Sequence, residues 1–217
     1  VGAPACDKDQ ALSTSVNFDQ AKNICEWISD DQMVLFPVTN SGYGIGQKEK
    51  FCDEKSPLNP ISHYGQTKVA AEKILLQTPS AITFRLATVF GIAPRMRMDL
   101  LVNDFVYRAY NDRFIVLFES HYKRNYIQIR DIISVFLHGI NNFDIMKGEP
   151  YNVGLSDANL SKFELCEEIK EQLPDFHVFE SDIGKDPDKR DYIVSNDKIE
   201  ATGWHPNYSI QDGIKEL

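Results

Sequence analysis

The chain has 217 residues, of which 42% are hydrophobic and 25% charged, and these proportions are ordinary for a folded globular protein. They exclude a disordered chain, a collagen-like fibre and a disulfide-rich miniprotein, and no apolar run approaches the roughly 18 residues of a membrane-spanning helix. The net charge of −9, without a basic cluster, argues against a nucleic-acid binder. We therefore expect neither nucleic acid nor a membrane as partner.

The four cysteines form no Cys-x-x-Cys pair and have no histidine at metal-ligand spacing. They are Cys6, Cys25, Cys52 and Cys166. We expect free buried thiols in a reducing cytosol and no metal site. The first residues lack the basic start and apolar core of a signal peptide, which also favours a cytoplasmic location.

The first quarter of the chain predicts a helix, a strand and two loops. Residues 13–29 have the pattern of a helix. Residues 33–38 are a continuous apolar run, typical of a strand buried on both faces of a parallel sheet, and Pro37 should lie near its end. The glycines of residues 41–46 do not fit G-x-G-x-x-G, so we expect a flexible loop rather than a phosphate cradle. Residues 47–63 carry turn signals and predict a second loop.

The rest of the chain alternates predicted helices and strands. Helices are expected over residues 64–77, 99–111, 131–142, 161–173 and 196–202. Strands are expected over residues 81–90, 114–118, 151–153 and 176–180, and a loop around Asp186-Pro187. This alternation indicates an α/β protein with parallel pairing and right-handed crossovers.

Tyr64 and Lys68 stand four residues apart in the first predicted helix of this series, so their side chains share one face. An ammonium beside a phenol favours the phenolate and lowers the tyrosine pKa from about 10. Such a tyrosine can exchange a proton with an alcohol near neutral pH. Taken alone, the same spacing occurs in a helix that carries both residues without any chemistry.

Thr39 follows the apolar run 33–38 and should stand at the carboxyl end of that strand. Ligands of open α/β sheets bind outside those ends. A hydroxyl there can bond a substrate oxygen and align it with Tyr64. The order of strand, hydroxyl, Pro-rich loop and Tyr-x-x-x-Lys helix therefore favours an enzyme.

The motifs in this order resemble those of a known family. They are T-N-S-G-Y-G at 39–44, S-P-L-N-P-I-S-H-Y-G-Q-T-K-V-A-A-E at 56–72, F-R-L-A-T-V-F-G-I-A-P-R-M-R at 84–97, K-R-N-Y-I-Q-I-R-D-I at 123–132, Y-N-V-G at 151–154 and K-R-D-Y-I-V-S-N-D-K-I-E-A-T-G-W-H-P at 189–206. The chain is similar to the extended short-chain dehydrogenase/reductases, and within them to the NAD-dependent nucleotide-sugar epimerases and dehydratases. The likeness covers essentially the whole chain.

The resemblance implies a Rossmann-like parallel sheet with a small C-terminal substrate lobe. Residues 1–91 and 127–154 would form the C-terminal part of the NAD domain. Residues 92–126 and 155–217 would form the lobe that binds a nucleotide-diphosphate sugar. Members are often homodimers through two helices, one of which carries the tyrosine, and the same is expected here by analogy.

The resemblance also implies roles for single residues. Tyr64 would be the acid/base, Lys68 its tuner and a ribose ligand, and Thr39 the hydroxyl that orients the substrate. The supporting position would be Asn17, the substrate ligands Asn40, Asn103, Arg124 and Arg190, and the further cofactor contacts Thr88 and Val89. The two arginines would hold the diphosphate, for which a guanidinium fork is well suited. Thr88 stands where many epimerases have Asn.

The Gly-rich phosphate loop and the acidic ribose ligand of the family are not present in the 217 residues. The chain begins like the family just after its fourth strand. We therefore expect these residues to be part of a longer polypeptide that binds NAD, with NADP also open. A chain that truly started at Val1 would instead be a non-catalytic remnant that binds a nucleotide sugar or a partner.

The two residues that follow Thr39 indicate the reaction type. Family dehydratases carry an Asp-Glu pair there, because loss of water needs an acid and a base beyond the tyrosine. Asn40 and Ser41 occupy these positions, and neither an amide nor an unassisted hydroxyl titrates near pH 7. We therefore expect an epimerase, with reduction of a keto sugar second and dehydration third. The sugar and its nucleotide are not encoded in these motifs.

Overall fold

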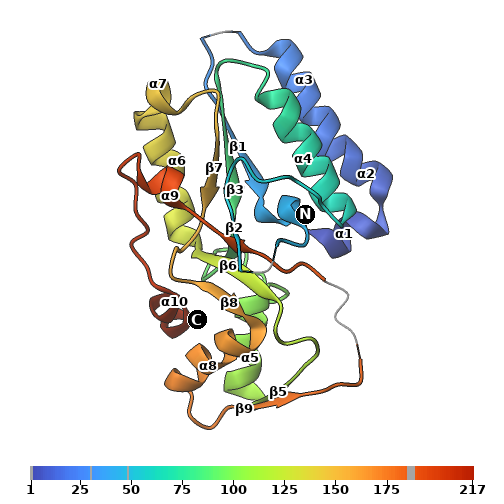
Figure 1. Cartoon of the computed structure of the whole chain (residues 1–217), viewed down its shortest axis with the longest axis vertical. Helices are drawn as coiled ribbons and strands as arrows, with labels where there is room; N and C mark the ends of the chain where they lie inside the picture. Colours follow the sequence, from blue (N-terminus) through green and yellow to red (C-terminus); the bar gives the residue numbers. More distant parts are fainter. Residues whose placement is uncertain (1, 30, 48, 185–188) are drawn as a thin grey trace.

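The structure is a computed structural model that describes residues 2–29, 31–47, 49–184 and 189–217. A sheet half and a smaller lobe follow one another along the long axis of the molecule (Figure 1). Both termini lie within the outline of the molecule, the N-terminus beside the sheet half and the C-terminus in the lobe (Figure 1). The expected α/β class is confirmed.

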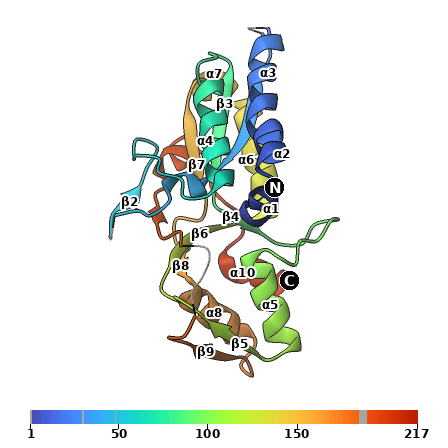
Figure 2. The same ribbon diagram turned by 90° about the vertical axis from the view of Figure 1, so that its right-hand side faces the viewer.

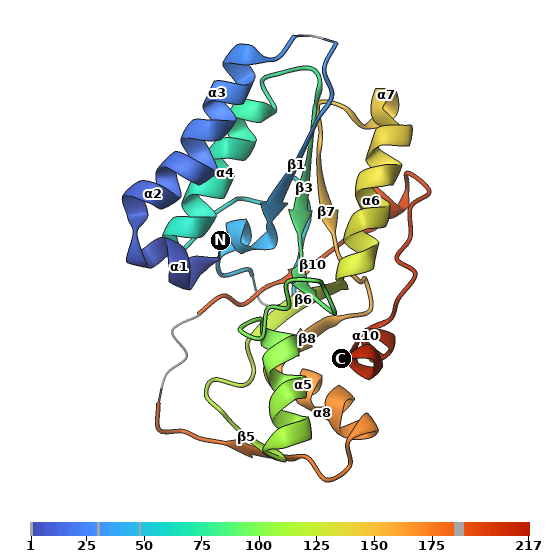
Figure 3. The ribbon, with the colours of Figure 1, turned by 180° about the vertical axis from the view of Figure 1, so that it is seen from behind.

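Three parallel strands form the centre of the sheet half, in the order β1-β3-β7. They are β1 (Val34–Thr39), β3 (Ala81–Leu86) and β7 (Pro150–Val153). One face is covered by α4 (His63–Leu75) and α3 (Gln20–Trp27), the other by α6 (Ile129–Asn141) and α7 (Phe143–Met146) (Figures 1 and 3). The carboxyl ends of all three strands point toward the lobe (Figure 3), where a doubly covered sheet binds its ligands.

The N-terminal helix is longer than the predicted 13–29 and is not uniform. It follows α1 (Ala3–Lys8) and consists of α2 (Gln10–Thr14), the π-helical turn η1 (Ser15–Asp19) and α3. The start lies earlier because Asp9 Oδ1 accepts a hydrogen bond from Leu12 N at 2.9 Å and caps the first turn. The π turn is a feature that apolar periodicity does not reveal.

Two predictions for residues 33–46 need correction. β1 runs two residues past Pro37 and ends at Thr39. Its residues are mostly half-buried rather than covered on both faces. The expected flexible loop at 41–46 is instead the 3₁₀ helix η2 (Asn40–Tyr43), all of whose residues are buried.

Residues 49–62 are loop as predicted, except for the short strand β2 (Phe51–Cys52), which pairs with β10 (Ile193–Val194), and His63 already belongs to α4. Figure 2 shows β2 at the side of the molecule away from α3. Neither short strand has a recognisable alternation in the sequence. Their pairing joins the loop before α4 to the segment that carries Arg190.

The predicted strand 81–90 is two strands in two different sheets. β3 ends at Leu86, and after Ala87 the chain continues as β4 (Thr88–Phe90), which pairs in parallel with β6 (Lys123–Gln128). β6 also pairs with β8 (Asn159–Ser161), and that pairing is antiparallel. The expectation of parallel pairing therefore holds for the sheet half but not for this part of the lobe.

The lobe contains three helices and a two-stranded parallel sheet. They are α5 (Leu101–Asn111), α8 (Lys162–Gln172), α10 (Ile210–Glu216), β5 (Phe114–Leu117) and β9 (His177–Glu180). These elements share one apolar core cluster that includes Val102, Ile115 and Leu165. The helix that Ser161 begins is confirmed, with a capping box between Ser161 and Glu164.

The expected division of the chain differs in one segment. α9 (Asp197–Glu200), which the sequence assigned to the lobe, packs against β7, and Ile199 and Trp204 belong to the core of the sheet half. Trp204 Nε1 donates to Ser134 Oγ of α6 at 2.9 Å. The predicted loop at Asp186-Pro187 lies outside the described residues. The helices of the described ranges are too short or too polar to cross a membrane.

Candidate active site

Helix α4 presents Tyr64 and Lys68 in its first two turns, beside the carboxyl end of β1. The helix begins where Ser62 Oγ accepts a hydrogen bond from Gly65 N at 3.1 Å. A Cβ on Gly65 would lie 2.9 Å from Pro60 Cβ, so glycine lets the Pro-rich loop pass close to the helix. The predicted start of the Tyr-x-x-x-Lys helix is thus fixed by a local cap.

Thr39 and Tyr64 lie close together, since the Thr39 hydroxyl is near enough to the Tyr64 phenol to lower its pKa, against the larger effect of burial. Thr39 Oγ1 also donates to Ser41 Oγ at 2.9 Å and accepts from Ser41 N at 3.1 Å. The hydroxyl is therefore held on two sides at the end of β1. A substrate oxygen placed between Thr39 and Tyr64 would meet two hydrogen-bonding groups.

The pKa of Tyr64 differs from the expectation. Burial raises the pKa of Tyr64, while the hydrogen bond with Thr39 and the charge of Arg190 act in the opposite direction. Lys68 Nζ lies over the Phe36 ring, 4.2 Å from the centroid. Burial lowers the pKa of Lys68 to about 8. Arg190 is a cation that favours the Tyr64 phenolate in this structure.

Asn17 supports the catalytic helix through one intermediate residue. Its Nδ2 lies 3.3 Å from Thr67 Oγ1 and 3.2 Å from Ser13 Oγ, and Thr67 Oγ1 donates to the Tyr64 carbonyl at 3.0 Å. The π turn places Asn17 there. Asn17 Nδ2 also donates to Cys6 Sγ at 3.7 Å.

Arg190 lies beside the Thr39–Tyr64 pair, since its guanidinium donates to Ser41 Oγ and its charge acts on Tyr64. Arg124 lies in β6, where it is buried, donates to the Lys123 carbonyl at 2.8 Å and stacks over Tyr192 with 5.8 Å between its Cζ and the ring centroid. The two predicted diphosphate ligands therefore come from the lobe and from the segment that joins the two halves.

Asn40 and Asn103 are both buried but differ in their partners. Both side-chain amide atoms of Asn40, which is 1% exposed, have no hydrogen-bond partner among the described residues. Both amide atoms of Asn103 have a partner, since Oδ1 accepts from Gly91 N at 3.0 Å and Nδ2 donates to the Arg97 carbonyl at 2.9 Å. Asn103 thus holds the 91–97 loop from inside.

Thr88 and Val89 are half-buried in β4. Their strand pairs with β6 rather than continuing the central sheet. The turn at Ala87 therefore places them where the sheet half meets the lobe, next to the carboxyl end of β3.

Two residues near Tyr64 were missed by sequence reasoning. The pKa of Arg97 is raised, mainly by its hydrogen bond to the Asp99 carboxylate. Tyr64 adds a smaller electrostatic contribution, so Arg97 lies near Tyr64. The buried Cys6 side chain also lies near Tyr64 and Lys68. The alternating Arg95-Met96-Arg97-Met98 run was the available signal for Arg97, whereas Cys6 offered only a lone cysteine.

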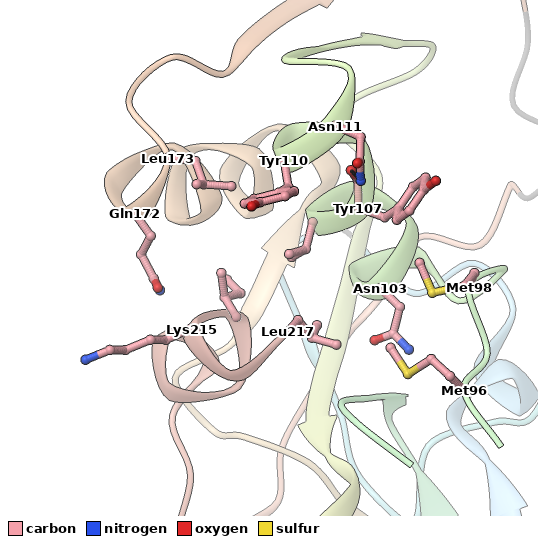
Figure 4. Close-up of a pocket in the computed structure, with 12 residues that line it drawn as sticks. Met96, Met98, Asn103, Tyr107, Tyr110, Asn111, Gln172, Leu173, Lys215 and Leu217 are labelled. Carbon is pink, nitrogen blue, oxygen red and sulfur yellow. Dashed lines mark hydrogen bonds between the residues drawn. The ribbon is translucent and has the colours of Figure 1, made fainter. Parts of the chain in front are cut away.

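A pocket of about 420 Å³ lies in the lobe between α5, α8 and α10 (Figure 4). Met96 and Met98 line one side of it and Tyr107 and Tyr110 another, so its walls are largely apolar. Tyr64 and Thr39 do not line it, but Asn103, a predicted substrate ligand, does. The pocket therefore shares one residue with the candidate active site.

Within the described ranges no cluster of His, Cys, Asp and Glu could hold a metal ion, and the four cysteines are unpaired. The residues around Tyr64 fit the ribose of a nicotinamide cofactor instead. Lys68 forms no ion pair with any described carboxylate and lies against the Phe36 ring. Its ammonium thus keeps N–H donors for ribose hydroxyls, and Tyr64 adds a hydroxyl one helical turn away.

Comparisons with known proteins show what this chain is similar to. The model of the NAD dependent epimerase/dehydratase family matches residues 2–154. The low-salt glycan biosynthesis protein Agl12 of Haloferax volcanii is 28% identical over 212 residues, which are 94% of this chain and 66% of that protein. The dTDP-D-glucose 4,6-dehydratase of Mus musculus is 29% identical over 200 residues, which are 84% of this chain and 53% of that protein. The chain thus spans between about half and two thirds of the length of these relatives.

Among solved structures, the UDP-glucose 4-epimerase of Thermus thermophilus in complex with NAD superposes with a TM-score of 0.81. It is 21% identical, and the match covers 99% of this chain and 72% of that one. At this identity the likeness shows the Rossmann-like fold.

Proposed function

Because this chain belongs to the NAD-dependent epimerase/dehydratase family, whose members are enzymes, we propose that it epimerises a nucleotide-diphosphate sugar with Tyr64 as acid/base. One observation carries this proposal: the hydroxyl of Thr39 lies near that of Tyr64, and Thr39 is followed by Asn40 and Ser41 rather than by two carboxylates. This pair of hydroxyls can move a proton at one sugar oxygen.

Ser41 and Asn40 are also placed so that they cannot easily act as an extra acid and base. The Ser41 hydroxyl contacts both Thr39 and Arg190, and the Asn40 side chain is enclosed. In the proposed reaction Tyr64 takes the proton of a sugar hydroxyl and returns it after the keto sugar has exposed its other face. The accompanying hydride chemistry belongs to NAD when it is bound.

The charges near Tyr64 support proton removal. The neutral phenol is favoured by burial, but the Thr39 hydrogen bond and the Arg190 charge both favour the phenolate. Lys68 and Tyr64 would hold the ribose, with Thr88 and Val89 beside the nicotinamide. Arg124 and Arg190 would hold the diphosphate, which brings two positive charges to an otherwise acidic protein.

We expect the complete protein, incubated with candidate nucleotide sugars, to convert one of them into its epimer at a single carbon. NMR of the products measures this directly. A dehydratase is the alternative, because the mouse relative bears that name. A 4-keto-6-deoxy product accumulating from an unmodified hexose would contradict the argument from Asn40 and Ser41, and a product that appears only from a keto sugar with added reduced cofactor would indicate a reductase.

We further propose that the protein forms a homodimer through two helices, α4, which carries Tyr64, and the neighbouring helix of α2, η1 and α3. Leu12, Val16 and Trp27 of that neighbouring helix are exposed, and Trp27 is 76% exposed. Large apolar side chains gathered on one face mark interaction surfaces. Analytical ultracentrifugation should show a dimer that Trp27→Glu weakens, while the same change at exposed Ile183 leaves the mass unaltered. A monomer at all concentrations would exclude this interface.

A further inference from the structure

A buried ion pair joins the helix of Tyr64 to the central strand. Arg85 of β3 and Glu72 of α4 are 5% and 1% exposed, and Arg85 Nε lies 3.0 Å from Glu72 Oε1 while Nη2 lies 3.0 Å from Oε2. Thr83 Oγ1 adds a third hydrogen bond to Glu72 at 2.9 Å. Tyr64, Lys68 and Glu72 follow one another at intervals of four residues, so the pair anchors the same face of α4 that carries the candidate chemistry.

Tyr43 of η2 hydrogen-bonds to the arginine of this ion pair. Arg85 Nη1 donates to the Tyr43 hydroxyl at 3.0 Å, and that hydroxyl lies 2.7 Å from Asn152 Oδ1 and 2.9 Å from the Asp53 carbonyl. Burial raises the pKa of Tyr43, so the phenol keeps its proton and donates it to one of these two acceptors. Tyr43 is 2% exposed and is the last residue of η2, which begins with Asn40 directly after Thr39.

The ring of Tyr43 extends the contacts toward the lobe. It meets the Tyr192 ring edge-on, with 6.1 Å between centroids and 63° between planes. Tyr192 in turn lies under Arg124, and Arg85 lies over Tyr43 at 5.6 Å. Two arginines and two tyrosines are thus joined in one stack, from β6 of the lobe to β3 of the sheet half.

We propose that Tyr43 is a positioning residue, which holds the Thr39–Ser41 segment at a fixed place against the Tyr64 helix and, through Tyr192, against Arg124. This inference rests on the proposed function, because it takes Thr39, Tyr64 and Arg124 as the reacting and binding groups. The hydroxyl of Tyr43 holds the Thr39–Ser41 segment in place, and its ring makes the contact with Tyr192. Tyr43 does not touch the reacting atoms itself.

Tyr43→Phe separates these two tasks, because it removes the hydroxyl and keeps the ring. In the complete protein we expect kcat to fall about tenfold or more, since a misplaced catalytic group is costly in rate, while the Kd of a nucleoside diphosphate stays within about twofold of the parent. The matched control is Tyr126→Phe. Tyr126 is also buried, but its hydroxyl has no hydrogen-bond partner among the described residues, so we expect no change in kcat.

A double-mutant cycle with Thr39→Ala distinguishes positioning from a merely structural role. If Tyr43 acts through Thr39, Tyr43→Phe has little further effect on kcat in the Thr39→Ala background. A structural role would give independent losses that multiply. Multiplied losses, or a Tyr43→Phe protein with the kcat of the parent, would overturn the inference.

Two further measurements keep the test independent of turnover and of the folding of one variant. Hydrogen exchange should become faster at residues 40–43 in Tyr43→Phe and not in Tyr126→Phe; equal protection in both would count against the inference.

Tyr192→Leu should weaken nucleoside-diphosphate binding, because Tyr192 supports Arg124. An affinity equal to that of the parent would contradict the proposed link to the lobe. A parent that neither binds nor converts any nucleotide sugar would contradict the proposed function, whereas an active parent with an equally active Tyr43→Phe protein contradicts this inference alone.

Discussion

Tyr64→Phe should lower turnover about 10²- to 10⁴-fold, the usual contribution of a general acid/base. The variant removes the phenol oxygen that lies near the Thr39 hydroxyl and retains the ring that packs in the site. The affinity for a nucleoside diphosphate should stay within a few fold of the parent, because Arg124 and Arg190 belong to other elements. Steady-state kinetics and titration calorimetry on the complete protein measure the two quantities separately.

Tyr110→Phe provides the control for turnover, since Tyr110 is an exposed tyrosine of α5 and does not belong to the Thr39–Tyr64 pair. It should keep parental turnover. Near-parental turnover of Tyr64→Phe would refute the catalytic assignment. Loss of diphosphate binding together with turnover would instead assign Tyr64 a role in folding.

Arg124→Ala and Arg190→Ala should each weaken nucleoside-diphosphate binding by about 1.5–3 kcal/mol, the range for hydrogen bonds to charged groups. That corresponds to a Kd about ten- to a hundredfold higher. The two arginines reach the site from different places: Arg124 is buried in β6 over Tyr192, and Arg190 contacts Ser41 beside the Tyr64 pair. Because both would touch one diphosphate, the effects should not be additive in the double variant.

Titration with UDP, GDP, CDP and dTDP tests the arginines and identifies the base at the same time. Lys147→Ala is a suitable control, because Lys147 follows α7 at the far end of the sheet half and pairs with exposed Asp144 at 2.8 Å. It should bind like the parent. Parental affinity in both arginine variants would place the diphosphate elsewhere in the protein.

Local sequence patterns predicted a helix correctly where its apolar spacing and its caps lie within the helix and its flanking residues. The Tyr64 helix and the helix after Ser161 follow from apolar spacing and from caps encoded within four residues. The strand 81–90 was less predictable, because its division at Ala87 depends on β6, which lies far along the chain. The buried η2 helix was unpredictable for the same reason: Val69 and Leu58, which pack around Gly42, lie outside the Asn40–Tyr43 segment that they help to bury.

The sequence predicted which residues form the candidate site better than it predicted the pKa of Tyr64. A hydroxyl at the end of a parallel strand and a tyrosine at the start of a helix must meet at one edge of the sheet, so the Thr39–Tyr64 contact follows from topology. The pKa of Tyr64 depends on burial and on which cation lies nearby. Lys68 is one turn away in sequence, but its ammonium lies over Phe36, and Arg190, from a distant segment of the chain, is a cation that acts on Tyr64.

The amino-acid sequence by itself determined the α/β class, the Tyr64–Lys68 helix and the likeness to a family, because periodicity, caps and ordered motifs are local properties of the chain. The tertiary structure alone decided the placement of Arg190, the use of the Asn103 amide for the 91–97 loop and the stack of Arg85, Tyr43, Tyr192 and Arg124. Each of these joins residues from distant segments. Their energies depend on burial and distance in the folded protein, which no local pattern records.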